Sequence, residues 1–318
     1  MVKKIYILVV LFFFSCDQTT TSYKPKSSGN IHTVSVVVED KVWKSKLGDN
    51  LRDVFASEFE GLPQQEPLFT LVHIPPKVFK DFAREGRNII KISLNTVDTA
   101  YIEKNKYASP QLVLNVEGRN SKAITKQLNK ISSKAILAFR NNEVMEKQRR
   151  IRKSVLKTEE FKALGVSLTL PSAYSLFKKD NQNKLWFQRE TKKGSVNFLT
   201  YTLPIITQPI TLEKVIKIRD SIGKEFIPGR NEGSYVITEK AYKPYFNKIK
   251  IKNLTAFKTK GTWEVVNDYM AGPFLNIMVE DIKNQRFIVF EGFVFSPSDR
   301  KREYMIELEA IIESLKIL

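Results

Sequence analysis

Hydrophobic and polar positions divide the chain into two parts on either side of a long helical stretch. In the first part, β-branched and apolar runs of five to eight residues predict strands at 33–38, 67–74, 88–94 and 111–116. Between the first two strands, apolar residues three and four apart predict one face of a short helix, formed by Leu47, Leu51, Val54 and Phe55.

From 119 to 164 the apolar spacing is that of a helix, and we predict a long helical connector. Its apolar stripe consists of Ile124, Leu128, Ile131, Ala135 and Phe139. The stripe loses its phase at Asn141 and Asn142. The most basic run follows, with Arg149, Arg150, Arg152 and Lys153. It fits either a patch for anionic lipid or polysaccharide, or a solvated face paired with Glu143, Glu146, Glu159 and Glu160.

After Gly165 the pattern is rich in β-structure. Alternating or apolar runs predict strands at 166–170, 185–189, 196–203, 234–238, 250–258, 262–266, 275–280 and 286–295. One helix is expected at 211–222. A closing helix is expected to be capped by Ser296, with Pro297 at its first position. Its apolar stripe consists of Tyr304, Leu308, Ile311, Leu315 and Leu318.

This order predicts an α+β protein of mainly antiparallel sheets packed with helices. We expect an N-terminal α/β half at 31–118, the connector at 119–164 and a C-terminal α+β half at 165–318. Residues 31–318 could also form one family domain. The order of elements in the C-terminal half resembles the Mog1/PsbP-like fold, an analogy that carries no function.

The first fifteen residues have the pattern of a lipoprotein signal peptide. Lys3 and Lys4 precede ten apolar residues, and the segment ends in Phe13-Phe14-Ser15-Cys16. This end resembles a bacterial lipobox, with Phe13 in place of the usual leucine. Cys16 is the only cysteine, so we predict that its sulfur carries diacylglycerol and that acyl chains such as palmitate anchor the protein.

The predicted anchor sets the location and the partners that we expect. Residues 16–30 are polar and predict a flexible tether. We expect a cell-envelope protein, anchored to the inner or outer membrane and facing the periplasm. An uncleaved anchor with an incidental cysteine is the alternative. No later segment has the roughly 20 apolar residues that a spanning helix needs.

The chain is strongly basic, with a formal charge of +18 over 318 residues. Such a surface attracts anionic partners, including phospholipid headgroups and lipopolysaccharide phosphates. A lysine-rich solvated surface explains the same charge. Expected partners are therefore the membrane, reached through the acyl chains, and a protein, anionic lipid or glycan. Nucleic acid is not expected, because an exported protein meets little of it.

No motif assigns a reaction. The chain has two histidines and one cysteine, so neither a metal site nor a cofactor is expected. Gly-x-Ser-x-Gly, P-loop and Gly-x-Gly-x-x-Gly motifs are absent. A glycan hydrolase would need two carboxylates about 5 to 9.5 Å apart. The candidates are Asp220, Glu232, Glu239, Asp268 and Glu291. Their sequence positions do not bring them together, so no catalytic residue is assigned.

Two segments are candidates for binding. The turn-rich loop 228–233 contains Arg230 and Glu232. The second segment combines aromatic and polar side chains, namely Trp263, Asn267, Asp268 and Tyr269. Such groups suit sugar stacking or a partner surface, and a hairpin whose aromatics complete the core is the alternative. Separately, Asp98-Thr99-Ala100 matches a short O-glycosylation pattern, with Thr99 as the acceptor.

Several longer blocks resemble one uncharacterised family. They are Gly61–Phe69, Arg219–Ser221, Ile227–Gly229, Gly233–Tyr235, Gly261–Trp263, Gly272–Phe274, Glu291–Val294, Lys301–Tyr304 and Leu308–Ala310. Together they resemble Bacteroidota lipoproteins known only as a domain of unknown function, across the whole mature chain from about Gly29. The resemblance implies an envelope lipoprotein and transfers no activity or site. We therefore expect a non-catalytic binding or assembly module. The alternative is a carboxylate-dependent envelope hydrolase acting on glycan or cell-wall material.

Overall fold

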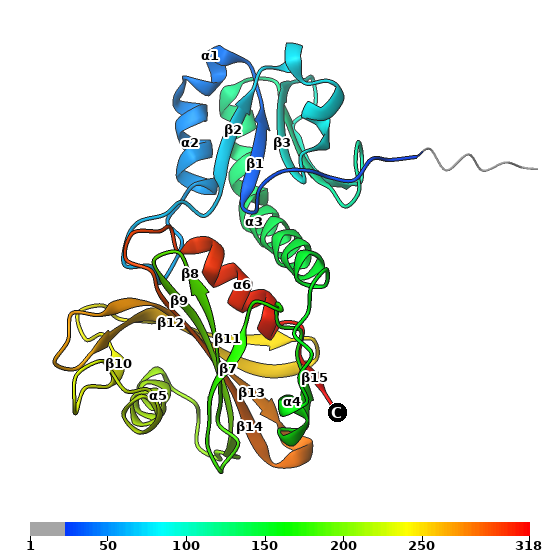
Figure 1. Ribbon diagram of the computed structural model, residues 1–318. Coiled ribbons are helices and arrows are strands. Elements are labelled where there is room, and N and C mark those ends of the chain that lie inside the picture. The colour runs from blue at the N-terminus through cyan, green and yellow to red at the C-terminus, as the bar shows by residue number, and fades with distance from the viewer. Residues whose placement is uncertain (1–22) are drawn as a thin grey trace, which may run out of the picture.

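The computed structural model describes residues 23–318, which form two parts joined by one long helix (Figure 1). The predicted signal peptide and Cys16 lie outside the described residues. Within residues 23–318, no helix combines the length and apolar composition needed to cross a membrane. The chain is α+β with mostly antiparallel sheets, as its sequence predicts.

The first part is built on a five-stranded sheet in the order β2-β1-β3-β5-β4. Its strands are β1 (Thr33–Val37), β2 (Thr70–Ile74), β3 (Asn88–Leu94), β4 (Thr99–Lys104) and β5 (Leu112–Gly118). Unlike the rest of the protein, this sheet is mainly parallel, and only β4 runs antiparallel to its neighbour. The sequence analysis missed β4, an edge strand whose residues are mostly half-buried.

Short helices connect the strands of this sheet. The connections contain α1 (Asp40–Trp43), α2 (Lys46–Phe55) and the 3-10 helices η1 (Pro76–Val78) and η2 (Asp81–Glu85). β2 lies on one side of β1 and β3 lies on the other. The chain therefore passes from β1 to β2 on one side of β1, and then crosses to β3 on the other side.

Helix α3 (Ser121–Ile151) is continuous over 31 residues, about 45 Å. Asn120 caps it by accepting a hydrogen bond from the backbone N–H of Ala123. The phase break at Asn141 and Asn142 is therefore not an interruption. Beyond Phe139 several residues on the buried face of α3 are polar, because the groups that this face contacts are also polar. The predicted connector is this helix followed by a turn and the short α4 (Glu160–Ala163).

The second part contains an eight-stranded antiparallel sheet in the order β10-β12-β13-β14-β9-β8-β7, with β11 paired to β12. Its strands are β7 (Ser175–Lys179), β8 (Leu185–Thr191), β9 (Gly194–Pro204), β10 (Val236–Thr238), β11 (Tyr245–Ile251), β12 (Leu254–Val265), β13 (Ala271–Asp281) and β14 (Arg286–Phe295). β6 (Val166–Ser167) and β15 (Lys316–Ile317) form a separate pair, and η3 (Ile282–Asn284) joins β13 to β14.

Two helices cover opposite faces of this sheet. Helix α5 (Leu212–Phe226) packs on the face that presents Met278 and Val289. Helix α6 (Arg302–Ile312) packs on the face that presents Ile277 and Phe290. The apolar core under α6 continues past α3 into the first sheet. The two parts therefore share one core.

The structure differs from several predictions for the second part. The strand expected at 250–258 spans the turn between β11 and β12, where Lys252 has a left-handed φ of 54°. The short strand β7 was not predicted. The closing helix begins at Arg302, not near Pro297, because Glu66 of the first part supplies its cap. The Glu66 carboxylate accepts hydrogen bonds from the backbone N–H groups of Lys301 and Arg302, at 2.6 and 3.3 Å.

The folded part begins before residue 30, within the segment predicted to be a tether. The backbone N–H of Ser27 donates to Ser109, and that of Ser28 donates to Glu85. These contacts hold the incoming chain beside the residues that precede β3 and β5.

Charged side chains join the two parts. Glu309 of α6 accepts hydrogen bonds from Arg140 of α3 and from Lys258 of β12. Glu307 of α6 lies 3.0 Å from Lys147 of α3 and 2.8 Å from Arg189 of β8. Burial opposes ionisation of Glu309, but the surrounding cations outweigh it and hold the Glu309 pKa far below its usual value.

Candidate functional site

The two segments predicted to bind a partner lie side by side. Arg230 donates two hydrogen bonds to the Asp268 carboxylate, at 3.0 and 2.7 Å. The Asn231 side chain donates to the Asn267 carbonyl at 3.2 Å. Glu232 and Tyr269 are fully solvent-facing. The ion pair holds the loop 228–233 against the β12–β13 turn. Arg230 and Asp268 therefore bind each other.

Trp263 does not reach this surface. Its side chain is 2% exposed and packs edge-on against Phe293, with the ring centroids 5.8 Å apart. The adjoining cavity, which Arg230 also lines, measures about 180 Å³. Ligand pockets for drug-sized molecules are usually about 300 Å³ or larger. Trp263 is thus a core residue. This is the alternative interpretation, in which the aromatic residues of the hairpin complete the core.

Two of the candidate hydrolase carboxylates lie on either side of one arginine. Nε of Arg219 is 2.6 Å from Glu291 Oε1, and Nη1 is 3.7 Å from Asp220 Oδ1. The guanidinium also lies 3.9 Å from the centre of the Phe274 ring. Burial raises the pKa of Glu291 even though Arg219 opposes this. Arg219 and Glu291 are buried, whereas the Asp220 side chain is 31% exposed. The group lines none of five cavities found among residues 23–318.

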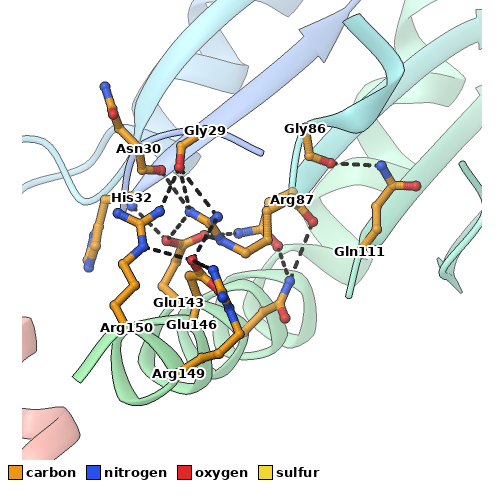
Figure 2. Close-up of polar contacts among 12 residues, drawn as sticks. Gly29, Asn30, His32, Gly86, Arg87, Gln111, Glu143, Glu146, Arg149 and Arg150 are labelled. Atoms are coloured by element: carbon orange, nitrogen blue, oxygen red, sulfur yellow. Dashed lines mark hydrogen bonds and ion pairs between the residues drawn. The ribbon is translucent and has the colours of Figure 1, made fainter. Parts of the chain in front are cut away.

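A second buried cluster joins α3 to the first sheet (Figure 2). Arg87 donates to both oxygens of Glu143, each at 3.0 Å. Glu143 also accepts hydrogen bonds from the backbone of His32 at 2.9 Å and from the side chain of Asn88 at 2.6 Å. Asn142 donates to Asn88 at 3.0 Å, which explains the polar residues inside α3.

Glu146 neutralises part of the basic run at the end of α3. It accepts hydrogen bonds from Arg149 at 2.6 and 2.8 Å and from Arg150 at 2.7 Å. Burial opposes ionisation of Glu146, but these hydrogen bonds outweigh it and lower its pKa to about 2. Arg150 also donates to the Gly29 carbonyl at 2.9 Å (Figure 2). Arg150 thus fastens the incoming chain to α3.

His32 is buried beside this cluster. Its ring lies between Phe59 and Phe69, and Nδ1 is 2.7 Å from the Leu68 carbonyl oxygen. Burial lowers the pKa of His32 to about 4, so the folded protein holds it neutral. Across residues 23–318, no three His, Cys, Asp or Glu side chains are grouped to hold a metal. Thr99, the predicted glycosylation site, is the half-buried first residue of the edge strand β4.

The largest of the five cavities, about 760 Å³, opens where the parallel strands β1 and β3 end. We call it the strand-end crevice. It is lined by Val37, Val38, Glu39, Lys41, Val42, Ser45, Leu47, Pro76, Lys91, Ile92, Ser93, Leu94, Ser121 and Ile124. In open sheets with parallel strands, ligands bind outside the carboxyl ends, where neighbouring connections diverge to opposite sides. The strand-end crevice lies at that position, because β1 leads to β2 on one side and pairs with β3 on the other.

The first turns of two longer helices also border the strand-end crevice. Ser45 caps α2 by accepting from the Leu47 N–H, and Ser121 is the first residue of α3. Lys91 stands out in β3 because it interrupts an apolar strand and is only half-buried. Neither Lys91 nor Lys41 has a carboxylate within 4 Å among residues 23–318. Two lysines there are thus free to meet an anion.

Sequence reasoning missed the strand-end crevice because four separate segments build it. One local signal was available, namely Lys91, the only charged residue in the predicted strand 88–94. A charge at a buried strand position is unusual without a partner.

Comparison with known families accounts for the whole described fold. A model described as a domain of unknown function, DUF4837, matches residues 153–314, about half of the chain. The chain belongs to the DUF4837 family. A second domain of unknown function, DUF8532, matches residues 27–152. The predicted resemblance to an uncharacterised family is therefore confirmed over residues 27–314. The two regions meet at the end of α3, so this DUF4837 protein carries its strand-end crevice in the DUF8532 region.

No curated protein matches this DUF4837 sequence. Several solved structures are similar over about half of it, and three of them are described here. PsbP of Synechocystis is 10% identical, with a TM-score of 0.33, covering 51% of this chain and 89% of its own. The Ran-binding protein Mog1p of Saccharomyces cerevisiae is 6% identical, with a TM-score of 0.32, covering 48% and 90%. LpqN of Mycobacterium tuberculosis, described as involved in cell envelope biogenesis, is 10% identical, with a TM-score of 0.29, covering 48% and 82%. PsbP and Mog1p are the proteins that give the Mog1/PsbP-like fold its name. Similarity of this degree carries no information on function.

Proposed function

We propose that this DUF4837 protein is a lipid-anchored, non-catalytic binding module of the cell envelope, and that its ligand occupies the strand-end crevice. The observation that carries the proposal is the crevice itself. Its volume of about 760 Å³ lies within the usual range for small-molecule sites, about 300 to 1,000 Å³. Its walls are mainly apolar, with a few polar groups that could orient a ligand.

The acidic side chains support binding over hydrolysis. A glycan hydrolase needs two carboxylates that face one substrate site. Of the five cavities found among residues 23–318, none is lined by more than one acidic residue. Glu143 and Glu291, whose pKa values burial raises, are both held in buried ion pairs. Such groups stabilise the fold and do not reach a substrate.

The strand-end crevice faces away from the point where the anchored segment enters the fold. Ser27 and Ser28 bind the residues that precede β5 and β3, which is the amino end of the parallel strands. The strand-end crevice lies at the carboxyl end of the same strands, where Lys41 and Val42 of α1, labelled in Figure 1, contribute to its lining. A protein tethered through Cys16 could therefore hold the strand-end crevice open to the surrounding aqueous space.

The anchor is tested by metabolic labelling with an alkyne-bearing palmitate analogue in cells that make the full chain. We expect the wild-type protein to take up the label and Cys16→Ser to take up none. The Cys16→Ser protein should also run differently on a denaturing gel, since the thioether lipid is missing. Equal labelling of both proteins would reject the lipid anchor.

Binding in the strand-end crevice is tested in the same cells by photo-crosslinking. The probe is a twelve-carbon alkyl compound with a diazirine on its chain and an alkyne for capture. We expect labelled peptides to come from residues 37–47, 91–94 and 121–124. Ser121→Trp places a bulky ring at the strand-end crevice and should abolish this labelling. Ser133→Trp, on an exposed part of α3, should not.

A further inference from the structure

We infer that the strand-end crevice selects an amphiphilic anion, an aliphatic chain that ends in a carboxylate or phosphate. This inference rests on the proposed function and names the ligand class of the same site. Three observations lead to it, namely the aliphatic wall, the unpaired lysines and the absence of aromatic groups from the lining.

The wall of the strand-end crevice is aliphatic and partly open to water. Its apolar members come from β1, α1, α2, β3 and α3 and the loops beside them, namely Val37, Val38, Val42, Leu47, Pro76, Ile92, Leu94 and Ile124. Leu94 is 69% exposed at the end of β3. An alkyl chain would cover such side chains and remove apolar surface from water, which favours its binding.

The two lysines supply the charge that the chain end would meet. Lys41 and Lys91 line the strand-end crevice, and Glu39 is its single acidic residue. Asp40, the next acid along the chain, lies 3.7 Å from His73 instead. A half-buried lysine without a carboxylate gains most from an anionic oxygen, through a charge-assisted hydrogen bond.

The amino ends of α2 and α3 also favour an anionic ligand. The Ser45 hydroxyl accepts from one backbone N–H of α2, and Asn120 accepts from one of α3. The other first-turn N–H groups form the positive ends of these helices. Their field adds to that of the lysines, so it favours an anionic head group and disfavours a cationic one.

The composition of the lining excludes other ligand classes. None of the fourteen lining residues is aromatic, so the described strand-end crevice has no surface on which a sugar ring or a nucleobase could stack. The ligand class that this lining fits is an aliphatic chain with one compact anionic end.

The test compares three photoreactive probes of equal length that end in a carboxylate, a phosphate or an alcohol. The full chain is labelled in its native envelope, and crosslinked peptides are quantified by mass spectrometry. We expect both anions to label the strand-end crevice about tenfold more than the alcohol, the ratio that one charge-assisted contact gives. A stronger phosphate signal indicates a lipid phosphate as the source, and a stronger carboxylate signal indicates a fatty acid.

Variants then assign the preference to the lysines. Lys41→Met together with Lys91→Met should reduce labelling by the anions to that of the alcohol and leave labelling by the alcohol unchanged. Lys130→Met, an exposed lysine further along α3, is the matched control and should keep the full preference.

The outcomes separate this inference from the proposed function. Equal labelling by all three probes, or a preference that survives the double lysine variant, overturns the inference and leaves the binding function in place. If no probe labels the strand-end crevice of the wild-type chain, the proposed function itself is rejected.

Discussion

Arg87 and Glu143 form a bidentate ion pair that is closed to solvent on every side. The guanidinium donates to both carboxylate oxygens at 3.0 Å, and the two side chains are 1% and 0% exposed. Arg87 immediately precedes β3, and Glu143 lies in α3. Arg87 also donates to the Asn30 carbonyl at 2.8 Å. The pair therefore holds a strand, a helix and the incoming chain together.

We expect Arg87→Met to lower the free energy of unfolding by about 3 to 5 kcal/mol, because it leaves the Glu143 carboxylate buried without its partner. Unfolding in urea, followed by circular dichroism, measures this loss. Arg230→Met is the matched control, since Arg230 makes the same bidentate contact with Asp268 but is 68% exposed. Its loss should be far smaller. Equal losses in the two variants would show that burial does not set the strength of the Arg87 pair.

Stability should fall as the pH drops from 6.5 toward 4. Burial lowers the pKa of His32 from 6.5 to about 4, so the unfolded chain takes up a proton in this range and the folded protein does not. The contribution of His32 is fully present above pH 6.5, decreases by up to about 3 kcal/mol toward pH 4 and then stays constant.

His32→Asn should reduce this pH dependence. His32 has a left-handed φ of 58°, which asparagine tolerates better than most residues. The measurement is the urea midpoint of both proteins at several pH values between 4 and 8. Curves that stay parallel over this range would mean that His32 does not cause the pH dependence.

Glu309→Gln should weaken the coupling between the two parts. The variant removes the carboxylate that holds Arg140 of α3 and Lys258 of β12, and it leaves both cations facing each other near the buried Lys260. We expect the single thermal transition of the wild type to separate into two, one for each part. Differential scanning calorimetry detects this. Glu303→Gln, on the exposed side of the same helix, should keep one transition.

Gly292→Ala should destabilise the contact between β14 and α6 by about 1 to 3 kcal/mol, through overpacking. A Cβ atom at residue 292 would lie 2.7 Å from Leu308, which is fully buried and cannot swing aside. The free energy of unfolding in urea is the readout. Adding Leu308→Val should recover part of the loss, whereas a double variant less stable than Gly292→Ala would contradict this packing.

The sequence by itself determined the elements whose own residue pattern is sufficient to define them. The runs 88–94 and 286–295 form strands with the predicted bounds, because most of their residues are apolar and buried. The α2 and α5 helices follow their apolar stripes. The loop 228–233 and the segment 263–269 were both predicted to bind a partner. The sequence did not predict the ion pair that joins them.

Tertiary structure decided everything that depends on distant partners. Helix α3 continues through Asn142 because Asn88, 54 residues earlier, satisfies its polar side chain. Helix α6 starts at Arg302 because Glu66, more than 230 residues earlier, accepts its first N–H groups. The strand-end crevice exists only where four separate segments converge. The local sequence pattern shows which face of an element is apolar. Only the folded chain brings in the distant polar group that satisfies a buried polar side chain or a helix end.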